Sequence, residues 1–149
     1  MENRSPAELR ALSDELDIFD GSEEPPRHLL EHGLYPPLPT CGSSLVWGFA
    51  LISAAERHGI STVRTTRMEC TRLEALETAL LLEGRRGRYS WSERIAVVDR
   101  SGPSPHRDVR TRLSVLTTGN PGLFEQVRQF RSLCPPLQQM VVAERMDLR

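Results

Sequence analysis

The sequence predicts an α+β protein, in which a small mixed sheet with packed helices is followed by a helical, helix-turn-helix-like C-terminal segment. Three observations lead to this prediction. Residues 45–65 show an apolar strand, a glycine, an amphipathic helix, a second glycine and a second strand. Ser/Thr-x-x-Glu capping boxes indicate helix starts at Ser5, Thr71 and Ser90. After Pro105 the chain shows only short amphipathic helical patterns.

Composition bounds the class of protein. The 149 residues suit one domain, or one domain with a small appendage, and 38% hydrophobic with 26% charged residues is typical of a soluble globular chain. No run of about 18 apolar residues occurs, so no membrane-spanning helix is expected. The acidic N-terminus does not resemble a signal peptide. The cytoplasm is therefore the predicted compartment, with no membrane partner.

Charge is distributed unevenly along a chain whose net charge is −1. Residues 1–33 carry nine acidic residues and three arginines, whereas residues 85–112 carry eight arginines and three acidic residues. All basic residues are arginine, which favours bidentate contacts with phosphate or carboxylate. A basic block in a nearly neutral chain can bind phosphate locally. A solvated arginine-rich surface without a ligand explains the same block equally well.

Cysteine and histidine spacings indicate no metal or redox motif. Cys41, Cys70 and Cys134 are odd in number, and no pair of them has the spacing of a zinc finger or a redox motif. They are predicted to be reduced, partly buried thiols. His28 and His32 share the spacing of one helix face, but no third ligand lies near them in the sequence, so no metal site is predicted.

The elements before the strand–helix–strand unit are predicted in chain order. Residues 1–26 are expected to form an acidic N-terminal helix, started by the first capping box, and a linker. A short helix is expected over 27–32, ending at Gly33. Three prolines in residues 34–40 exclude a central strand, so this segment is expected to be extended at a sheet edge.

The elements that follow are predicted from apolar spacing and capping. Helices are expected over 51–58 and 72–83, with a strand over 61–65 between them. A further helix runs from Ser90 to about residue 100. The proline- and glycine-containing segment 101–105 is a predicted hinge or domain boundary.

Residues 106–149 are predicted to form the helix-turn-helix-like tail. Apolar spacing indicates one helix over 107–116, a second capped by Asn120 and a third that starts at Cys134. The helical pattern stops abruptly at Arg149, so this segment is expected to be a piece of a longer helix-turn-helix region.

Gly48 is the first candidate site residue, because it lies at the corner between a predicted strand and a predicted helix. A glycine at such a corner lets the backbone approach a ligand phosphate. A tight turn that packs the helix on the sheet explains the same glycine. Gly59 is predicted to be left-handed at the end of that helix, and Val46 and Leu51 are expected to be buried.

Five short motifs follow one another over residues 27–145. They are the turn Glu31-His32-Gly33-Leu34 before Pro36-Pro37, Gly48 before the pair Ala54-Ala55 and the turn Gly59-Ile60, the helix Glu74-Ala75-Leu76-Glu77 followed by Arg85-Arg86, the segment Ser90-Trp91-Ser92-Glu93, and the turn Leu133-Cys134-Pro135-Pro136-Leu137-Gln138. In this order they resemble the ParB/sulfiredoxin-like domain of ParB-type chromosome-partition proteins.

This resemblance implies a ParB/sulfiredoxin-like fold over 27–100 and a glycine box that holds CTP through arginines. Here the arginine positions are Phe49, Ala50 and Leu51, so nucleotide binding is predicted to be weak or lost and no cofactor is expected. Phe49 also stands where sulfiredoxins need a cysteine, so peroxiredoxin repair is not expected.

The predicted function is that of a ParB-like, nucleoid-associated DNA-binding protein of the partition or transcription-regulator type. In the predicted loop before Ser90, two flanking glycines and a helix N-terminus favour an anion, whereas Glu83 either repels an anion or pairs with an arginine. The candidate phosphate contacts are Gly48, Arg85, Arg86 and Arg88, and the candidate DNA contacts in the tail are Arg107, Arg110 and Arg112.

Two alternatives remain open. In the first, a degenerate, non-catalytic module of the same fold buries a partner segment or its own tail in an apolar pocket around Phe49 and Leu51, and its expected partners are another protein or a second copy of the chain. In the second, the fold supports an enzyme such as a nuclease or kinase. The enzyme is disfavoured because the sequence shows no acid–base pair or metal cluster at the expected site.

Overall fold

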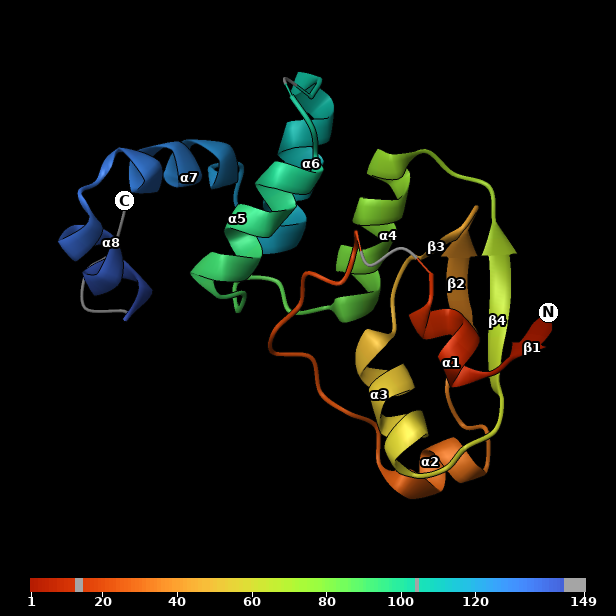
Figure 1. Cartoon of the computed structure of the whole chain (residues 1–149). Coiled ribbons are helices and arrows are strands. Elements are labelled where there is room, and N and C mark those ends of the chain that lie inside the picture. Colours follow the sequence, from red (N-terminus) through yellow and green to blue (C-terminus); the bar gives the residue numbers. More distant parts are fainter. Residues whose placement is uncertain (13–14, 104, 144–149) are drawn as a thin grey trace. The chain divides into compact units, whose positions relative to one another are not determined.

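A computed structural model describes residues 1–12, 15–103 and 105–143. The described residues form an α+β structure with one four-stranded mixed sheet and eight helices (Figure 1). The chain divides into two compact units, Met1–Glu83 and Gly84–Arg149. The first unit contains the sheet and helices α1–α4, and the second contains helices α5–α8.

The sheet of the first unit has the strand order β1-β4-β2-β3. Its central strands β2 and β4 run parallel, and both outer pairs are antiparallel (Figure 1). The predicted small mixed sheet is therefore confirmed, and β1 is a strand that the sequence analysis missed. The strands are β1 (Glu2–Arg4), β2 (Leu38–Cys41), β3 (Ser44–Leu45) and β4 (Val63–Met68).

Strand β2 lies between β3 and β4, so the prediction that the prolines keep this segment at a sheet edge is wrong. The carbonyl of Pro39 accepts a hydrogen bond from the Val46 N–H at 2.9 Å. The N–H and C=O of one strand residue point to the same side, so the Pro39 nitrogen also faces away from β4. On that side β3 pairs with β2 only from Thr40 onward. The missing N–H therefore leaves the β2–β4 hydrogen bonds intact.

Four helices accompany the sheet. Two of them begin at predicted capping boxes, in which the side chains of Ser5 and Thr71 accept hydrogen bonds from the Glu8 and Glu74 N–H groups, both at 3.2 Å. The first helix is short and ends at Arg10. The helices are α1 (Pro6–Arg10), α2 (Arg27–Glu31), α3 (Phe49–Arg57) and α4 (Arg72–Glu83).

The core of the first unit joins α1, α2 and α3 to strands β2–β4, and both α1 and α2 pack on α3. Val46 and Leu51 are buried, as predicted. The apolar face of α3 packs on the sheet, so burial of this face stabilises the helix more than propensity does. The buried cluster consists of Leu9, Leu30, Leu38, Leu45, Leu51, Ile52, Ala54, Ala55 and Val63.

Two glycines delimit α3. Gly59 has a φ of +69°, and the Ile60 N–H donates to the Ala55 carbonyl at 2.9 Å, so the predicted left-handed C-terminal turn is confirmed. Gly48, which precedes the helix, has a φ of +107°. A Cβ at Gly48 would lie 2.5 Å from Leu38 Cδ2, a buried side chain of β2. Gly48 thus lets the start of α3 approach the sheet closely.

The second unit is a group of four helices in which α7 packs against α5, α6 and α8. Its core includes Val97, Leu113, Leu123 and Val127, and the ring of Trp91 stacks on Phe130 with centroids 5.0 Å apart. The helices are α5 (Trp91–Arg100), α6 (Arg107–Thr118), α7 (Leu123–Ser132) and α8 (Pro135–Val142).

The turns between these helices follow the sequence closely. Cys134 precedes α8 as predicted. Asn120 was predicted to cap α7, but the N-cap is Gly122, two residues later. The Asn120 Oδ1 accepts a hydrogen bond from the Gly122 N–H at 3.0 Å. The pattern that stops at Arg149 lies outside the described residues.

The predicted domain divisions, 1–26, 27–100 and 106–149, stay predictions. In the structure, β1 and α1 contribute to the sheet and core of the first unit. Helix α5 packs with α7 in the second unit.

Replacing Gly48 with alanine is expected to lower the free energy of unfolding by about 3 kcal/mol, because positive-φ strain adds to overlap with Leu38. The matched control is Gly59→Ala, which has positive φ but no neighbouring atom within 4 Å. This control is expected to lose only about 1 kcal/mol. Urea unfolding followed by circular dichroism measures both losses. Equal losses would show that Leu38 moves away from the new Cβ without lowering the free energy of unfolding.

Candidate anion and nucleic-acid site

The predicted phosphate loop, residues 84–90, is held against the C-terminal end of α6. The Gly87 N–H donates to the Thr117 carbonyl at 2.8 Å. The aliphatic stem of Arg86 lies over Gly119, with its Cγ and Cδ 3.6 Å from the position of a Cβ there. Within the loop, the Arg88 N–H donates to the Arg85 carbonyl at 2.8 Å. The loop therefore has a defined conformation within the second unit.

Arg85 is enclosed by two residues of its own unit. Its guanidinium forms an ion pair with the Glu93 carboxylate, including an Nη1–Oε1 distance of 3.3 Å. The same guanidinium lies over the Tyr89 ring, 4.8 Å from the centroid, and the Tyr89 hydroxyl accepts from the Arg85 backbone N–H. The Arg85 side chain is 17% exposed and the Glu93 side chain 2%. Arg85 therefore neutralises a buried carboxylate.

Glu93 also completes the capping box of α5. Its Oε1 accepts from the Ser90 N–H at 2.9 Å, and its own N–H donates to Ser90 Oγ at 3.2 Å. The carboxylate lies at the N-terminal end of the helix, where the partial positive charge favours an anion. This is the place where the sequence analysis expected a phosphate. The protein's own carboxylate occupies it, so a phosphate reaching Arg85 would have to displace Glu93.

The pKa of Glu93 reflects these competing effects. Burial of the carboxyl group favours its neutral form and by itself raises the pKa. Hydrogen bonds from Arg85 and Ser90, with the positive charge of Arg85, together outweigh burial. The pKa of Glu93 therefore lies below its ordinary value of 4.5. The carboxylate is ionised at neutral pH, as its pairing with Arg85 requires.

Arg86 and Arg88 differ from Arg85 because both are exposed. Arg86 lies beside the C-terminal end of α6, where the partial negative charge of the helix favours a cation. Glu83, which was predicted to repel an anion or to pair with an arginine of this loop, belongs to the first unit. There its carboxylate accepts hydrogen bonds from Ser22 Oγ and Trp47 Nε1, both at 2.8 Å.

Gly48 and the residues after it serve packing in the first unit. Gly48 is buried beneath Leu38, as described above. Leu51, which stands at a predicted arginine position of the glycine box, is 5% exposed and belongs to the core. Phe49 is half-buried and packs against the same core. The predicted apolar pocket around Phe49 and Leu51 is therefore largely filled by the unit's own side chains.

The three candidate arginines of the tail are all exposed on α6. At about 100° per residue, Arg107 and Arg110 lie on one side of the helix, and Arg112 lies on a different side. The Arg110 guanidinium lies over the Phe124 ring, 5.0 Å from its centroid. Arg107 stands at the opposite end of α6 from the loop that carries Arg86. The length of this helix, about 18 Å, therefore separates the two predicted groups of arginines.

Charge segregates between the two units. Met1–Glu83 contains seven arginines and fourteen acidic residues, a net charge of −7, whereas Gly84–Arg149 contains twelve arginines and six acidic residues, a net charge of +6. Residues 85–112 carry part of this asymmetry, with eight arginines and three acidic residues. The unit boundary shows that it extends along the rest of each unit.

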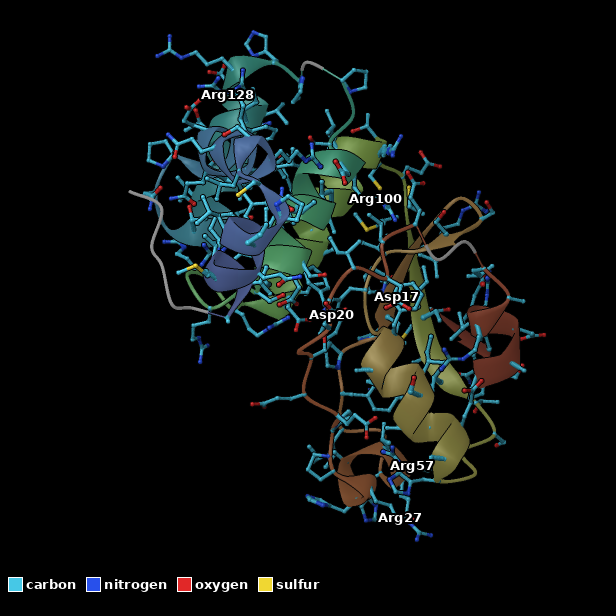
Figure 2. The ribbon with its side chains drawn as sticks, turned by 60° about the vertical axis from the view of Figure 1, so that its left-hand side comes forward. Asp17, Asp20, Arg27, Arg57, Arg100 and Arg128 are labelled. Carbon is cyan, nitrogen blue, oxygen red and sulfur yellow. The ribbon has the colours of Figure 1, made fainter. Side chains whose placement is uncertain are left out.

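Most arginines of the first unit are paired with acidic side chains of the same unit. Arg27 of α2 and Arg57 of α3, both labelled in Figure 2, pair with Glu31 and Glu24. Acidic residues therefore remain in excess in this unit after these pairs form, whereas the second unit has twice as many arginines as acidic residues. Further ion pairs of the first unit include Arg4–Glu2, Arg10–Glu56 and Arg72–Glu15.

The first unit also contains a pocket of about 520 Å³ that the sequence analysis did not predict. Arg64 lines it and donates to the carbonyls of Gly33 and Tyr35, with its guanidinium 5.1 Å from the centroid of the Tyr35 ring. Gly33 and Gly59, each just beyond the end of a helix, line the same pocket. Arg64 thus places a positive charge beside the C-terminal end of α2.

No protein family, no curated protein and no solved structure matches this chain. No helix in the described part of the chain combines the length and apolarity that crossing a bilayer requires. Among the same residues, no group of three or more His, Cys, Asp or Glu side chains is placed to hold a metal ion. Together these features define an α+β protein with an acidic sheet unit and an arginine-rich helical unit.

Replacing Arg85 with alanine is expected to lower the free energy of unfolding of the second unit by about 3 kcal/mol, because Glu93 is left buried without its counter-ion. Trp91 fluorescence during urea unfolding reports on this unit when all variants carry Trp47→Phe. The matched control is Arg128→Ala, which removes an arginine from an exposed pair with Glu125 and should change little. Similar losses in both variants would contradict a structural role for Arg85.

The depressed pKa of Glu93 predicts a defined pH dependence. The carboxylate stabilises the second unit fully above its unfolded pKa near 4.5, and this contribution is lost as pH falls through the lower folded value. The stability difference between wild type and Glu93→Gln should therefore shrink as pH falls below about 4.5. Urea midpoints from pH 3 to 7 measure it. The pKa of Glu125 is lowered too, by its hydrogen bond from Arg128, but this pair is exposed and screened by solvent, so Glu125→Gln should show a much smaller change with pH. A constant gap between wild type and Glu93→Gln would refute this assignment.

Proposed function

We propose that this chain is a DNA-associated protein, of the partition or transcription-regulator type that its motifs resemble, and that the second unit contacts DNA phosphates. The observation that carries the proposal is the segregation of charge, with +6 on Gly84–Arg149 and −7 on Met1–Glu83. A local excess of arginine attracts a polyanion even when the whole chain is nearly neutral.

The placement of exposed arginines supports a phosphate-binding surface on α6. Arg107 and Arg110 share one side of this helix. Arg86 and Arg88 are exposed in the loop held at its other end. Arg85 has no place in this surface, because it neutralises Glu93. The proposed contacts are therefore Arg86, Arg88, Arg107 and Arg110.

The order of short helices supports the same proposal. Helices α6, α7 and α8 are joined by turns of four and two residues, an arrangement that resembles a helix-turn-helix segment. The third of them, α8, carries no arginine, and its Gln138 side chain donates to the carbonyls of Phe130 and Leu133. We therefore propose contacts to the DNA backbone that position the protein without reading a sequence.

Nucleotide binding has little part in the proposed function. The family that the motifs resemble uses arginines in a glycine box, and this chain has Phe49, Ala50 and Leu51 there. Gly48 packs on Leu38 and Leu51 lies in the core. Loss of charge-assisted contacts to a triphosphate removes roughly 1.5–3 kcal/mol for each contact. CTP affinity is accordingly expected to be weak or absent.

Salt titration of DNA binding tests the proposal. Arg107→Ala with Arg110→Ala should reduce the slope of log Kobs against log salt by roughly two, about 0.9 for each phosphate contact. Fluorescence anisotropy with a labelled duplex measures this slope. The matched control is Arg27→Ala with Arg57→Ala, which removes two arginines that are paired with carboxylates in the first unit.

The outcomes separate surface contact from general charge. An unchanged slope in the control and a reduced slope in the α6 variant support the proposed surface. Equal reductions in both would show that only net charge matters, and an unchanged slope in the α6 variant would place the contacts elsewhere. Circular dichroism verifies that each double variant remains folded.

A second candidate function, binding to another protein, rests on exposed apolar residues. Leu81 and Leu82 on α4 are 64% and 41% exposed, and Met140 and Val142 on α8 are 41% and 56% exposed. Exposed apolar groups of this kind occur at protein interfaces. If wild-type protein binds no DNA at low salt, this interaction module becomes the better interpretation.

A further inference from the structure

Cys41 and Cys70 meet at one end of the sheet although 29 positions separate them in the sequence. Cys41 is the last residue of β2, and its register partner on β4 is Met68. Cys70 follows two residues after β4 ends. Because β2 and β4 are parallel, their carboxyl ends lie at the same end of the sheet, and this brings the two cysteines together. Their sulfur atoms are 2.7 Å apart.

The contact between the two thiols is specific in its orientation. The Cys41 thiol donates to the Cys70 carbonyl oxygen at 3.2 Å, and the Cys70 thiol donates to the Cys41 sulfur. Each side chain therefore points at the other residue. A disulfide bond is about 2.05 Å long, so the sulfurs need to approach by only about 0.7 Å.

Regular structure fixes the backbone on both sides of this contact. Cys41 pairs with Ser44 across the tight β2–β3 turn. Cys70 immediately precedes Thr71, which caps α4 and whose N–H donates to Glu74 Oε2 at 2.7 Å. Both cysteines are half-buried, so part of each side chain is open to solvent.

We propose that Cys41 and Cys70 form a reversible disulfide when the protein meets a low-molecular-weight disulfide, which makes this end of the sheet a redox modification site. One cysteine thiolate attacks a sulfur of oxidised glutathione and releases one glutathione thiolate. The second cysteine then attacks the protein sulfur of the mixed disulfide and releases the other glutathione. The two cysteine thiols lose two electrons and two protons, and oxidised glutathione becomes two reduced glutathiones.

The environment of Cys70 suits it to the second step. Burial, with the hydrogen bond to Cys41, raises the pKa of Cys70 to about 11. Its thiolate is therefore scarce at neutral pH, which slows attack on a dissolved disulfide. In the second step the target sulfur belongs to the neighbouring Cys41, and proximity offsets the low thiolate fraction.

The bond would close a loop that contains β3, α3 and β4. It would join the β2–β3 turn to the connection between β4 and α4. Restricting this loop in the unfolded chain is expected to raise the Tm of the first unit by on the order of 10 °C. Cys134, in the second unit, is exposed and lies at the N-cap of α8. Because this third thiol could also exchange with glutathione, the main test replaces it with serine.

The test uses the full chain with Cys134→Ser, incubated at fixed ratios of reduced to oxidised glutathione. Formation of the bond should remove two titratable thiols and lower the intact mass by about 2 Da. Trypsin cleaves this lysine-free chain only after arginine, so Cys41 and Cys70 lie in peptides 28–57 and 68–72. A linked pair of these peptides that separates on reduction is the expected product.

Two matched variants complete the design. Cys41→Ser and Cys70→Ser, each combined with Cys134→Ser, should accept a single glutathione or stay reduced, with no rise in Tm. The decisive comparison is made at glutathione ratios that glutathionylate these controls. If the Cys134→Ser protein then keeps two free thiols, or carries only glutathione adducts, the proposal is overturned. Linkage of either cysteine to Cys134 in place of the 41–70 bond in wild-type protein would overturn it as well.

Discussion

A buried carboxylate requires both a counter-ion and hydrogen-bond donors, and the beginning of the second unit supplies them to Glu93. Arg85 provides the charge, and Ser90 provides donors from the capping box. Meeting these needs orders the loop, starts α5 and turns Arg85 inward. The exposed arginines of this unit are those that do not pair with the Glu93 carboxylate. The surface that we propose for DNA phosphates is thus limited by an internal electrostatic requirement.

The two units handle their arginines differently. In the first unit, pairs such as Arg10–Glu56 and Arg57–Glu24 join elements distant in sequence, and an acidic excess remains. In the second, arginines outnumber acids, and several stack on aromatic rings, as Arg110 does on Phe124. Stacking orients a guanidinium without neutralising it. Within the described part of the chain, Arg110 pairs with no carboxylate, unlike Arg85, which supports its place in the proposed phosphate-binding surface.

Local signals in the sequence predicted most of the fold. The capping boxes at Ser5, Thr71 and Ser90, and the positive φ of Gly59, depend on residues within a few positions. Contacts between distant residues were missed: β1 needs β4, and the Cys41–Cys70 contact needs the register of two parallel strands. In the candidate site, a basic loop was predictable, but the engagement of Arg85 by Glu93 depends on burial, which charge patterns do not report.

The separation of charge also governs how copies of this molecule meet in solution. A chain with net charge −1 has little overall repulsion between copies. The acidic unit of one molecule and the arginine-rich unit of another nevertheless attract each other. Such contacts between oppositely charged patches weaken as ions screen them. The protein should thus be least soluble in dilute buffer and should salt in, the opposite of the response expected from a uniformly charged chain.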